Sequence, residues 1–445
     1  MEWKESPPER KRERSGCPNW IVRPSSIPIG WLFTLLSSEL EASASNPHLH
    51  RAILRSLHRA FSVMLSNISA QLLPVTTSPQ FAAHPSPAAP SPAQLYAAAF
   101  ATFAAELLEN LQSRGLFLTD HHGVVGIADS LGGIRENLET LIGRVIVPLV
   151  SGIKKDLVPL IDALEFNAPA PPILSKQATT HHKGAAVHPS IGSLQHLIYS
   201  YAHNLVQYTT PATMTSQTTL ATLLISLVWH GLVALSHRAP MPRSSSIATA
   251  PNQQTALSST LRWRKVSGST TPPTAPSVRF SLKPPSPPLT SPPYPAMDAR
   301  ALYNLFNVLP RPNGNSRYVL AREAVDEAFG GLAAMCALLD YEAAGNLENL
   351  DGATADLPTV IALPVLLRIF GRGQDEKGSG EAWDVPSMLG VTEKKYRGEY
   401  LGGFGMAEEG GPMVAKCVLD VLVERHDVKC ERLIHWLEGR ANSGD

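Results

Sequence analysis

Residues 166–297 contain neither aspartate nor glutamate, and this acid-free band constrains the fold more than any other feature of the chain. The band carries nine lysines and arginines among many Ser, Thr and Pro residues. Because the whole chain has a formal net charge of zero at pH 7, the balancing acids lie outside the band, mainly after Asp298. The centre of the chain is therefore a cationic, hydroxyl-rich region between two flanks of mixed charge.

The composition predicts that part of the chain packs and part does not. With 445 residues, of which 44% are hydrophobic, there is enough apolar material for at least one sizeable core. Only 17% of the residues are charged and 38 are proline, which is typical of long uncharged loops or disorder. We predict a disordered tail over 1–30, a helical domain over 31–237, a disordered cationic linker over 238–297 and a second helical domain over 298–440.

Helical periodicity dominates the first of these domains. Apolar residues recur at three- and four-residue spacing over 48–73, which predicts one amphipathic helix. Ser91 and Pro92 are a typical N-cap and first-turn pair for a second helix. A third apolar stripe runs over 134–164, where Pro148 and Pro159 are expected to break or kink the helix.

The region after residue 297 also has helical rather than strand patterns. Asp298 is predicted to cap a helix, and further apolar helices are expected around 325–339, 358–370, 391–401, 414–424 and 428–439. The chain has no series of alternating strands and no repeat of fixed period. We therefore predict an all-α fold of irregular helical bundles with a long disordered Pro/Ser/Thr-rich linker.

One stretch imitates a catalytic motif. Residues 128–132 read Ala-Asp-Ser-Leu-Gly, which resembles a relaxed nucleophile elbow with Ser130 as the nucleophile. A working elbow sits between a strand and a helix of a parallel sheet, with an acid and a histidine downstream. Helical patterns and an acid-free band follow instead, so the favoured role of Ser130 is to cap a helix that starts at Leu131. A serine hydrolase using Ser130 remains the second alternative.

Histidine and cysteine clusters suggest metal binding only weakly. The pairs His121-His122 and His181-His182, with His188 nearby, favour solvated loops, because a structural zinc needs four converging ligands. Cys417, His426, Cys430 and His435 form the other set, but the helical spacing of the two cysteines predicts buried thiols. Neither a phosphate loop nor a dinucleotide fingerprint is present. We assign no catalytic, cofactor-binding or metal-ligating residue and predict no cofactor.

Two basic regions of the chain could indicate a partner other than a protein, namely a nucleic acid or a membrane surface. The cations around Trp263 are too sparse for a nucleic-acid-binding tail. The helix with Arg51, Arg55, His58 and Arg59 has the pattern of a membrane-surface helix, but a bundle helix with a solvated basic face has the same pattern.

A membrane-spanning helix is the more serious rival. Thr218 to Ser236 contains no charged residue and is long enough to cross a bilayer. Several threonines, Ser226 and His230 dilute its hydrophobicity, so we favour a central helix buried on most sides. A membrane-associated protein is kept as the first alternative.

The remaining features bear on location and regulation. The four cysteines are scattered without a CxxC pair, which favours a reducing compartment, and region 10–44 imitates a signal peptide only loosely because acids and a proline interrupt it. We predict a protein of the cytoplasm or nucleus. Thr271, Ser286 and Ser291 each precede proline and are candidate phosphorylation sites.

The sequence therefore favours a non-enzymatic intracellular scaffold or assembly subunit. It is expected to bind other proteins through its helical faces and its Pro/Ser-rich linker.

Overall fold

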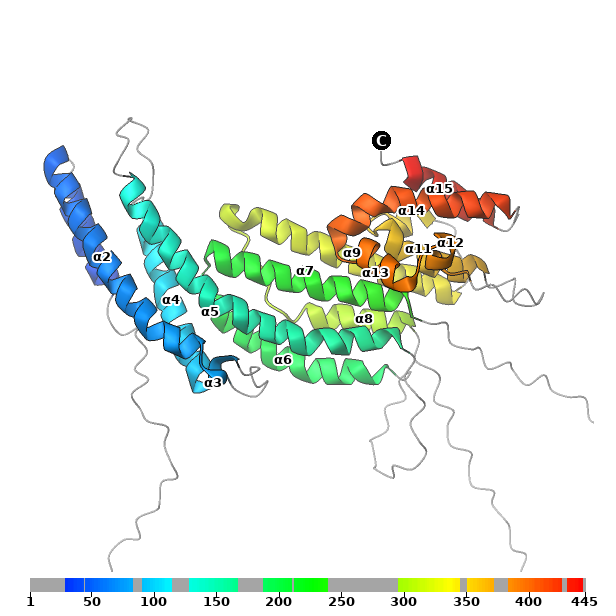
Figure 1. Cartoon of the computed structure of the whole chain (residues 1–445), viewed down its shortest axis with the longest axis horizontal. Coiled ribbons are helices and arrows are strands. Elements are labelled where there is room, and N and C mark those ends of the chain that lie inside the picture. Colours follow the sequence, from blue (N-terminus) through cyan, green and yellow to red (C-terminus); the bar gives the residue numbers. More distant parts are fainter. Residues whose placement is uncertain are drawn as a thin grey trace, which may run out of the picture.

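The structure is a computed structural model that describes ten segments of the chain. They are residues 29–43, 45–82, 90–113, 128–166, 187–209, 212–238, 295–344, 350–371, 383–425 and 430–442. Every regular element in these segments is helical, so the predicted all-α fold is confirmed. Figure 1 shows the helices side by side in an elongated body, with α2 at one end, α7 in the middle and α14 and α15 towards the other end.

The first half of the body, residues 29–238, contains long helices with short ones between them. They are α1 (Ile29–Ser43), α2 (Pro47–Thr76), α3 (Pro79–Ala82), α4 (Pro92–Ser113), α5 (Ala128–Asp162), the 3-10 turn η2 (Ala163–Glu165), α6 (Pro189–Thr209) and α7 (Met214–Ser236).

The second half, residues 295–442, has shorter helices around one long one. They are α8 (Pro295–Phe306), η3 (Ser316–Tyr318), α9 (Val319–Ala344), α10 (Leu350–Thr354), α11 (Thr359–Gly371), α12 (Val385–Met388), α13 (Glu393–Tyr400), α14 (Phe404–Glu424) and α15 (Glu431–Asn442).

Side-chain caps fix where several of these helices begin. The Asn46 side chain accepts hydrogen bonds from the amides of His48 and Leu49 at 3.1 and 3.3 Å, so α2 begins at Pro47. At α4 the Ser91 hydroxyl accepts from the Gln94 amide at 3.2 Å, and the Gln94 side chain accepts from the Ser91 amide at 2.9 Å. This reciprocal capping box confirms the predicted start of α4.

The prolines of α5 do not end it. The helix runs without a break from Ala128 to Asp162, through Pro148 and Pro159, although Figure 1 shows that it bends. Each internal proline costs about 3 kcal/mol because it removes a backbone hydrogen bond and crowds the preceding turn. Burial of the apolar stripe that flanks them, including Leu149 and Leu157 at 2% and 0% exposure, offsets that cost. Of the predicted break or kink, a bend is therefore present and a break is not.

Helix α7 is the centre of the body and packs against helices from both halves. Its neighbours include α5 and α6 from the first half and α8, α9 and α11 from the second. Apolar residues occupy most of its circumference, and Leu224, Leu227 and Leu232 are at most 1% exposed. A helix that is apolar around most of its circumference is stable only when most of its sides are buried, and α7 meets this need by packing between the two halves.

The two halves share one continuous hydrophobic core and are joined by polar contacts as well. The Trp229 indole of α7 donates to the Leu401 carbonyl at 2.8 Å, and its ring lies 4.7 Å from that of Phe404. At the other end of α7, the Gln217 side chain accepts from the Asn313 amide at 2.7 Å. Whether 31–237 or 298–440 would fold alone stays a prediction.

The edges of the predicted disordered segments belong to the helical body. Residues 239–294 of the linker and 1–28 of the tail lie outside the described residues. Arg238, however, is fully buried, and residues 295–297 form the first turn of α8. Asp298 is therefore within α8 instead of capping it, which corrects the predicted start of that helix.

Candidate functional site

The described residues that flank two segments of the acid-free band lie close together in the body. Segment 167–186 is bounded by Phe166 and Val187, and segment 239–294 by Arg238 and Pro295. The His188 ring contacts the Phe166 carbonyl at 3.1 Å, and the His188 amide donates to Asp298 at 2.8 Å. Asp298 also binds Arg238. We call Phe166, His188, Arg238 and Asp298 the loop base.

A buried ion pair is the centre of the loop base. Arg238 Nη1 donates to Asp298 Oδ2, and the two side chains are 1% and 0% exposed. The other carboxylate oxygen accepts the His188 amide, so both oxygens of Asp298 are satisfied. A buried pair of this kind holds its two segments firmly, because separating them leaves a charge in a medium of low dielectric constant. The ends of segment 239–294 are thus fixed side by side.

His188 closes the loop base as a neutral imidazole. Its Nδ1 accepts a hydrogen bond from the Ser190 amide at 3.2 Å, so the proton is assigned to Nε2, which donates to the Phe166 carbonyl. Burial lowers the pKa of His188 and the nearby Arg238 lowers it further, while the contacts to Phe166 and Asp298 oppose the shift. The ring therefore stays uncharged near neutral pH and acts as a fixed hydrogen-bonding group.

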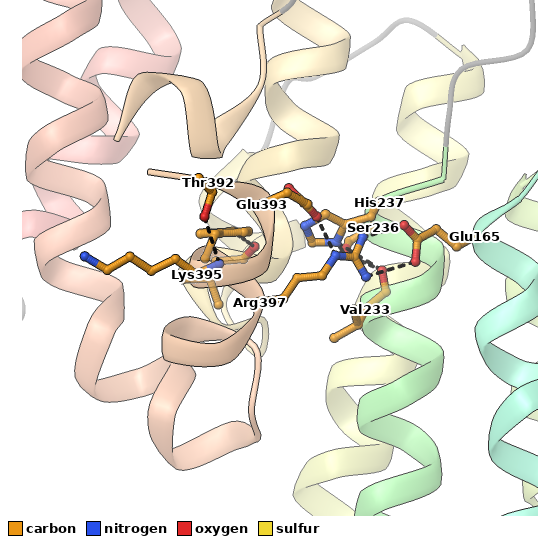
Figure 2. Close-up of polar contacts among 10 residues, drawn as sticks. Glu165, Val233, Ser236, His237, Thr392, Glu393, Lys395 and Arg397 are labelled. Carbon is orange, nitrogen blue, oxygen red and sulfur yellow. Dashed lines mark hydrogen bonds and ion pairs between the residues drawn. The ribbon is translucent and has the colours of Figure 1, made fainter. Parts of the chain in front are cut away.

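Two further arginines, Arg397 and Arg368, bind near the C-terminal end of α7, and Figure 2 shows the first of them between Glu165 and Glu393. Arg397 of α13 binds both carboxylate oxygens of Glu165, one of them at 3.1 Å, and its Nε donates to Glu393. Burial alone would lower the pKa of Arg397, but the bonds to Glu165 and Glu393 raise it. This bidentate contact ties η2 in the first half to α13 in the second.

Arg368 makes the equivalent contact from α11. Its Nη1 donates to the backbone carbonyl of Ser236, the last residue of α7, and its Nη2 lies 3.5 Å from Glu342. A cation at a helix C-terminus satisfies free carbonyl groups and is favoured by the helix dipole. The pairs Arg397–Glu165 and Arg368–Glu342 both lie where the two halves of the body meet.

The Ser236–His237 contact resembles a nucleophile and base but has no access to a substrate. His237 Nδ1 lies 2.8 Å from the Ser236 hydroxyl, which itself donates to the Val233 carbonyl at 3.0 Å (Figure 2). Ser236 is 0% exposed. Burial lowers the pKa of His237, an effect that the backbone bond to Val233 opposes. The geometry fits a helix end that satisfies its own carbonyls.

Most of the residues considered for catalysis or metal binding are either far from suitable partners in the structure or lie outside the described residues. Ser130 lies in the first turn of α5, which starts at Ala128 and not at Leu131 as predicted. The described ranges contain no strand, so a nucleophile elbow has no sheet there to support it. The pairs 121–122 and 181–182, and Thr271, Ser286 and Ser291, lie outside the described residues.

One of the two cysteine predictions is confirmed and the other is wrong. Cys430 is buried, as its helical spacing predicted, but Cys417 is exposed on α14, so that prediction is wrong. The buried stripe of α14 follows Val414 and Val418, and residue 417 lies about a third of a turn outside it. His426 is outside the described residues and His435 is exposed. Within the described segments no three His, Cys, Asp or Glu residues are grouped as metal ligands.

The predicted apolar span corresponds to α7. By length and composition alone this helix could cross a bilayer, and it is the one helix among the described residues that could. In the folded body 61% of its most apolar window is buried against other helices. Its environment is therefore that of a core helix, as the sequence favoured.

Comparisons with known proteins identify no relative of this chain. No protein-family model, curated protein or solved structure matches the chain. The site must therefore be interpreted from its own residues. Sequence reasoning missed the pairing of Arg238 with Asp298, although Asp298 is the first acid after Glu165 and was the one available signal.

Proposed function

We propose that the protein is a non-enzymatic intracellular scaffold or assembly subunit, placed in the cytoplasm or nucleus, that binds other proteins. Helical faces and the Pro/Ser-rich segment 239–294 are its binding surfaces. The loop base is the observation that supports this function most directly. A buried ion pair fixes both ends of a long acid-free segment at one point of a helical body.

The chemistry of segment 239–294 suits capture of a partner protein. It contains arginines and lysines without any carboxylate, together with many prolines and hydroxyl groups. Cations that have no acids within their own segment attract acidic surfaces, and proline-rich chain loses little entropy when it binds in an extended form. Phosphate added at Thr271, Ser286 or Ser291 would reverse the local charge and release such a partner.

Replacement of residues 239–294 tests the proposal. A Gly/Ser chain of equal length would replace the segment in the full protein, and partners would be captured from the protein's own cells by tagged wild type and variant. We expect specific partners to be lost while the thermal unfolding midpoint is unchanged, because the replaced residues begin after Arg238 and end before Pro295.

A matched control separates charge from sequence. In the control variant only the cations of the segment change, as Arg243→Gln, Arg262→Gln, Arg264→Gln, Lys265→Gln, Arg279→Gln and Lys283→Gln. Loss of the same partners assigns binding to the charges. Retention of every partner by the Gly/Ser variant would remove this segment from the proposed function.

Two other outcomes would replace the proposal with an alternative. Retention of the protein in the membrane pellet after carbonate extraction would support a bilayer-spanning α7, whose length and composition permit it. Labelling by a fluorophosphonate probe that Ser130→Ala abolishes would support a serine hydrolase. Release into the supernatant and absence of labelling are the results expected for a scaffold.

A further inference from the structure

The outward face of α2 carries three arginines that have no partner within the described part of the chain. Arg51, Arg55 and Arg59 are exposed and follow one another at four-residue spacing. They form a stripe about 12 Å long on one side of the helix. Neither an ion pair nor a hydrogen bond links these side chains to any described residue. Their charge is available to another molecule.

The composition of α2 makes this charge unusual. All thirty residues of α2 lack aspartate and glutamate, so the helix has no acid to balance its arginines. Many arginines elsewhere in the body form ion pairs within it. The ion-paired arginines are Arg135, Arg238, Arg300, Arg311, Arg322, Arg368 and Arg397.

A polar groove continues the stripe along the same helix face. It lies between α2 and α5 and has a volume of about 260 Å³. Its polar lining consists of Ser62, Ser66, Ser69, Asn137, Thr140 and Arg144. Residues 51 and 69 are eighteen positions, or five full turns, apart, so arginines and serines share one face of α2. The lining offers hydroxyl, amide and guanidinium donors and contains no carboxylate.

Exposed apolar side chains border the polar stripe. Val63 and Leu73 of α2 are 56% and 59% exposed. Val63 lies beside the stripe and Leu73 continues it towards the end of α2, so a partner helix with a charged and an apolar face could contact both kinds of side chain here. α2 forms the outer edge of the body, where a partner helix can approach it (Figure 1).

We propose that this face of α2 and its groove bind an acidic amphipathic helix of a partner protein. Carboxylates spaced one turn apart on that helix would lie along Arg51, Arg55 and Arg59, and one acidic side chain would enter the groove towards Arg144 and the hydroxyl groups. The groove between α2 and α5 has a volume of about 260 Å³, which is enough for a carboxylate side chain of a partner helix whose neighbouring acids contact the arginines. The inference rests on the proposed protein-binding function and names the partner class at a different surface.

Selection from a random peptide-display library on the full-length protein tests the inference. We expect the selected peptides to be helical and acidic, with Asp or Glu at three- and four-residue spacing. Fluorescence anisotropy then compares wild type with the variant R51Q/R55Q/R59Q. Binding should weaken about tenfold or more, because each exposed ion pair contributes a factor of up to about five, and it should weaken with added salt.

A charge-matched control and a stability measurement exclude indirect effects. The control variant K154Q/K155Q/K395Q removes three cations from α5 and α13, away from the α2 face. It should bind the selected peptides within about twofold of wild type, since steering by net charge alone is a weak effect at physiological salt. Thermal unfolding of R51Q/R55Q/R59Q should match wild type, because the three side chains are exposed.

Several outcomes would overturn the inference. Selected peptides without excess acid, or acidic peptides that bind the triple variant as tightly as wild type, contradict it. Arginine-dependent binding to phosphatidylserine vesicles or to duplex DNA, in place of peptides, would assign the face to another class of ligand. Arginine-dependent self-association would assign it to a second copy of the chain. Failure here is distinct from failure of the proposed function, because the variant with residues 239–294 replaced keeps the α2 face.

Discussion

The arginines of α2 and those at the end of α7 are the same residue type in opposite settings. Arg51, Arg55 and Arg59 are exposed and unpaired among the described residues, and they belong to a helix without acids. Arg238 is fully buried and binds Asp298, which lies sixty positions further along the chain. A buried pair fixes the fold, while a solvated stripe contributes little to stability and leaves its charge to other molecules.

The difference follows from what each helix packs against. The C-terminal end of α7 meets both halves, and acids from three other elements reach it: Glu165, Asp298 and Glu342. α2 packs through one narrow apolar face against α1, α3, α4 and α5. Arg51, Arg55 and Arg59 lie outside that apolar face, and no acid among the described residues pairs with them. Position in the bundle, more than local sequence, sets what an arginine does.

Breaking the buried pair should have the largest effect. Arg238→Ala would leave the Asp298 carboxylate buried without its cation, and we expect a loss of about 3–5 kcal/mol of unfolding free energy. The double variant Arg238→Met with Asp298→Leu removes both charges and should recover most of that loss. Urea denaturation at pH 7 measures both. A loss from Arg238→Ala no greater than that from Arg51→Ala would contradict the contrast between the two regions.

Truncation of the shared core should have the next largest effect. Leu232→Ala in α7 leaves a cavity at a residue that is 0% exposed, and we expect it to cost about 2–5 kcal/mol. The matched change Leu73→Ala lies on the exposed side of α2 and should cost less than about 0.5 kcal/mol. Differential scanning calorimetry of the two variants compares them directly. Equal costs would mean that α7 is not the centre of the fold.

Acid should destabilise the α7 end through its neutral histidines. Burial lowers the folded-state pKa of His188 and of His237 below the ordinary value of 6.5. As pH falls through 6.5 the unfolded chain takes up protons that the folded chain does not, so the unfolding free energy decreases from about pH 6.5 downwards. The urea midpoint should fall between pH 7.5 and 5.5, and the variant His237→Gln should show a smaller fall. An unchanged slope in that variant would remove His237 from this explanation.

The smallest effect on stability is expected on α2. The variant R51Q/R55Q/R59Q should unfold at the wild-type urea midpoint at low salt, because no described residue pairs with these arginines. In contrast, Arg397→Gln removes a bidentate bond to Glu165 and should shift the midpoint down, by less in high salt. A stability loss in the α2 variant as large as that of Arg397→Gln would show that the stripe has a structural partner.

Local patterns in the sequence predicted the elements well. The apolar spacing of 48–73 and the Ser91 cap identify α2 and α4, because both signals act within one or two turns. Of the break or kink predicted at Pro148 and Pro159 only a bend is present, because tertiary burial of the flanking stripe outweighs the local cost of proline and keeps the helix continuous. The exposed Cys417 was predicted to be buried because a short pattern leaves the centre of a buried face uncertain by about a third of a turn.

Long-range pairing was not predictable in the same way. Nothing local to Arg238 indicates Asp298 as its partner, nor Glu165 as the partner of Arg397 across more than two hundred positions. The apolar circumference of α7 did predict a buried helix, but not that its neighbours would come from both halves. Such contacts depend on the assembled bundle, and the acid-free interval before Asp298 was the one sequence signal for any of them.

Cleavage of the chain within 239–294 tests the central claim that α7 joins both halves in one core. A protease recognition site inserted in this segment allows the folded full-length protein to be cut, and size-exclusion chromatography then follows the products. The account predicts that the two fragments stay together at the elution volume of the uncut protein and separate only in denaturant. Separation into two folded fragments under native conditions would contradict it.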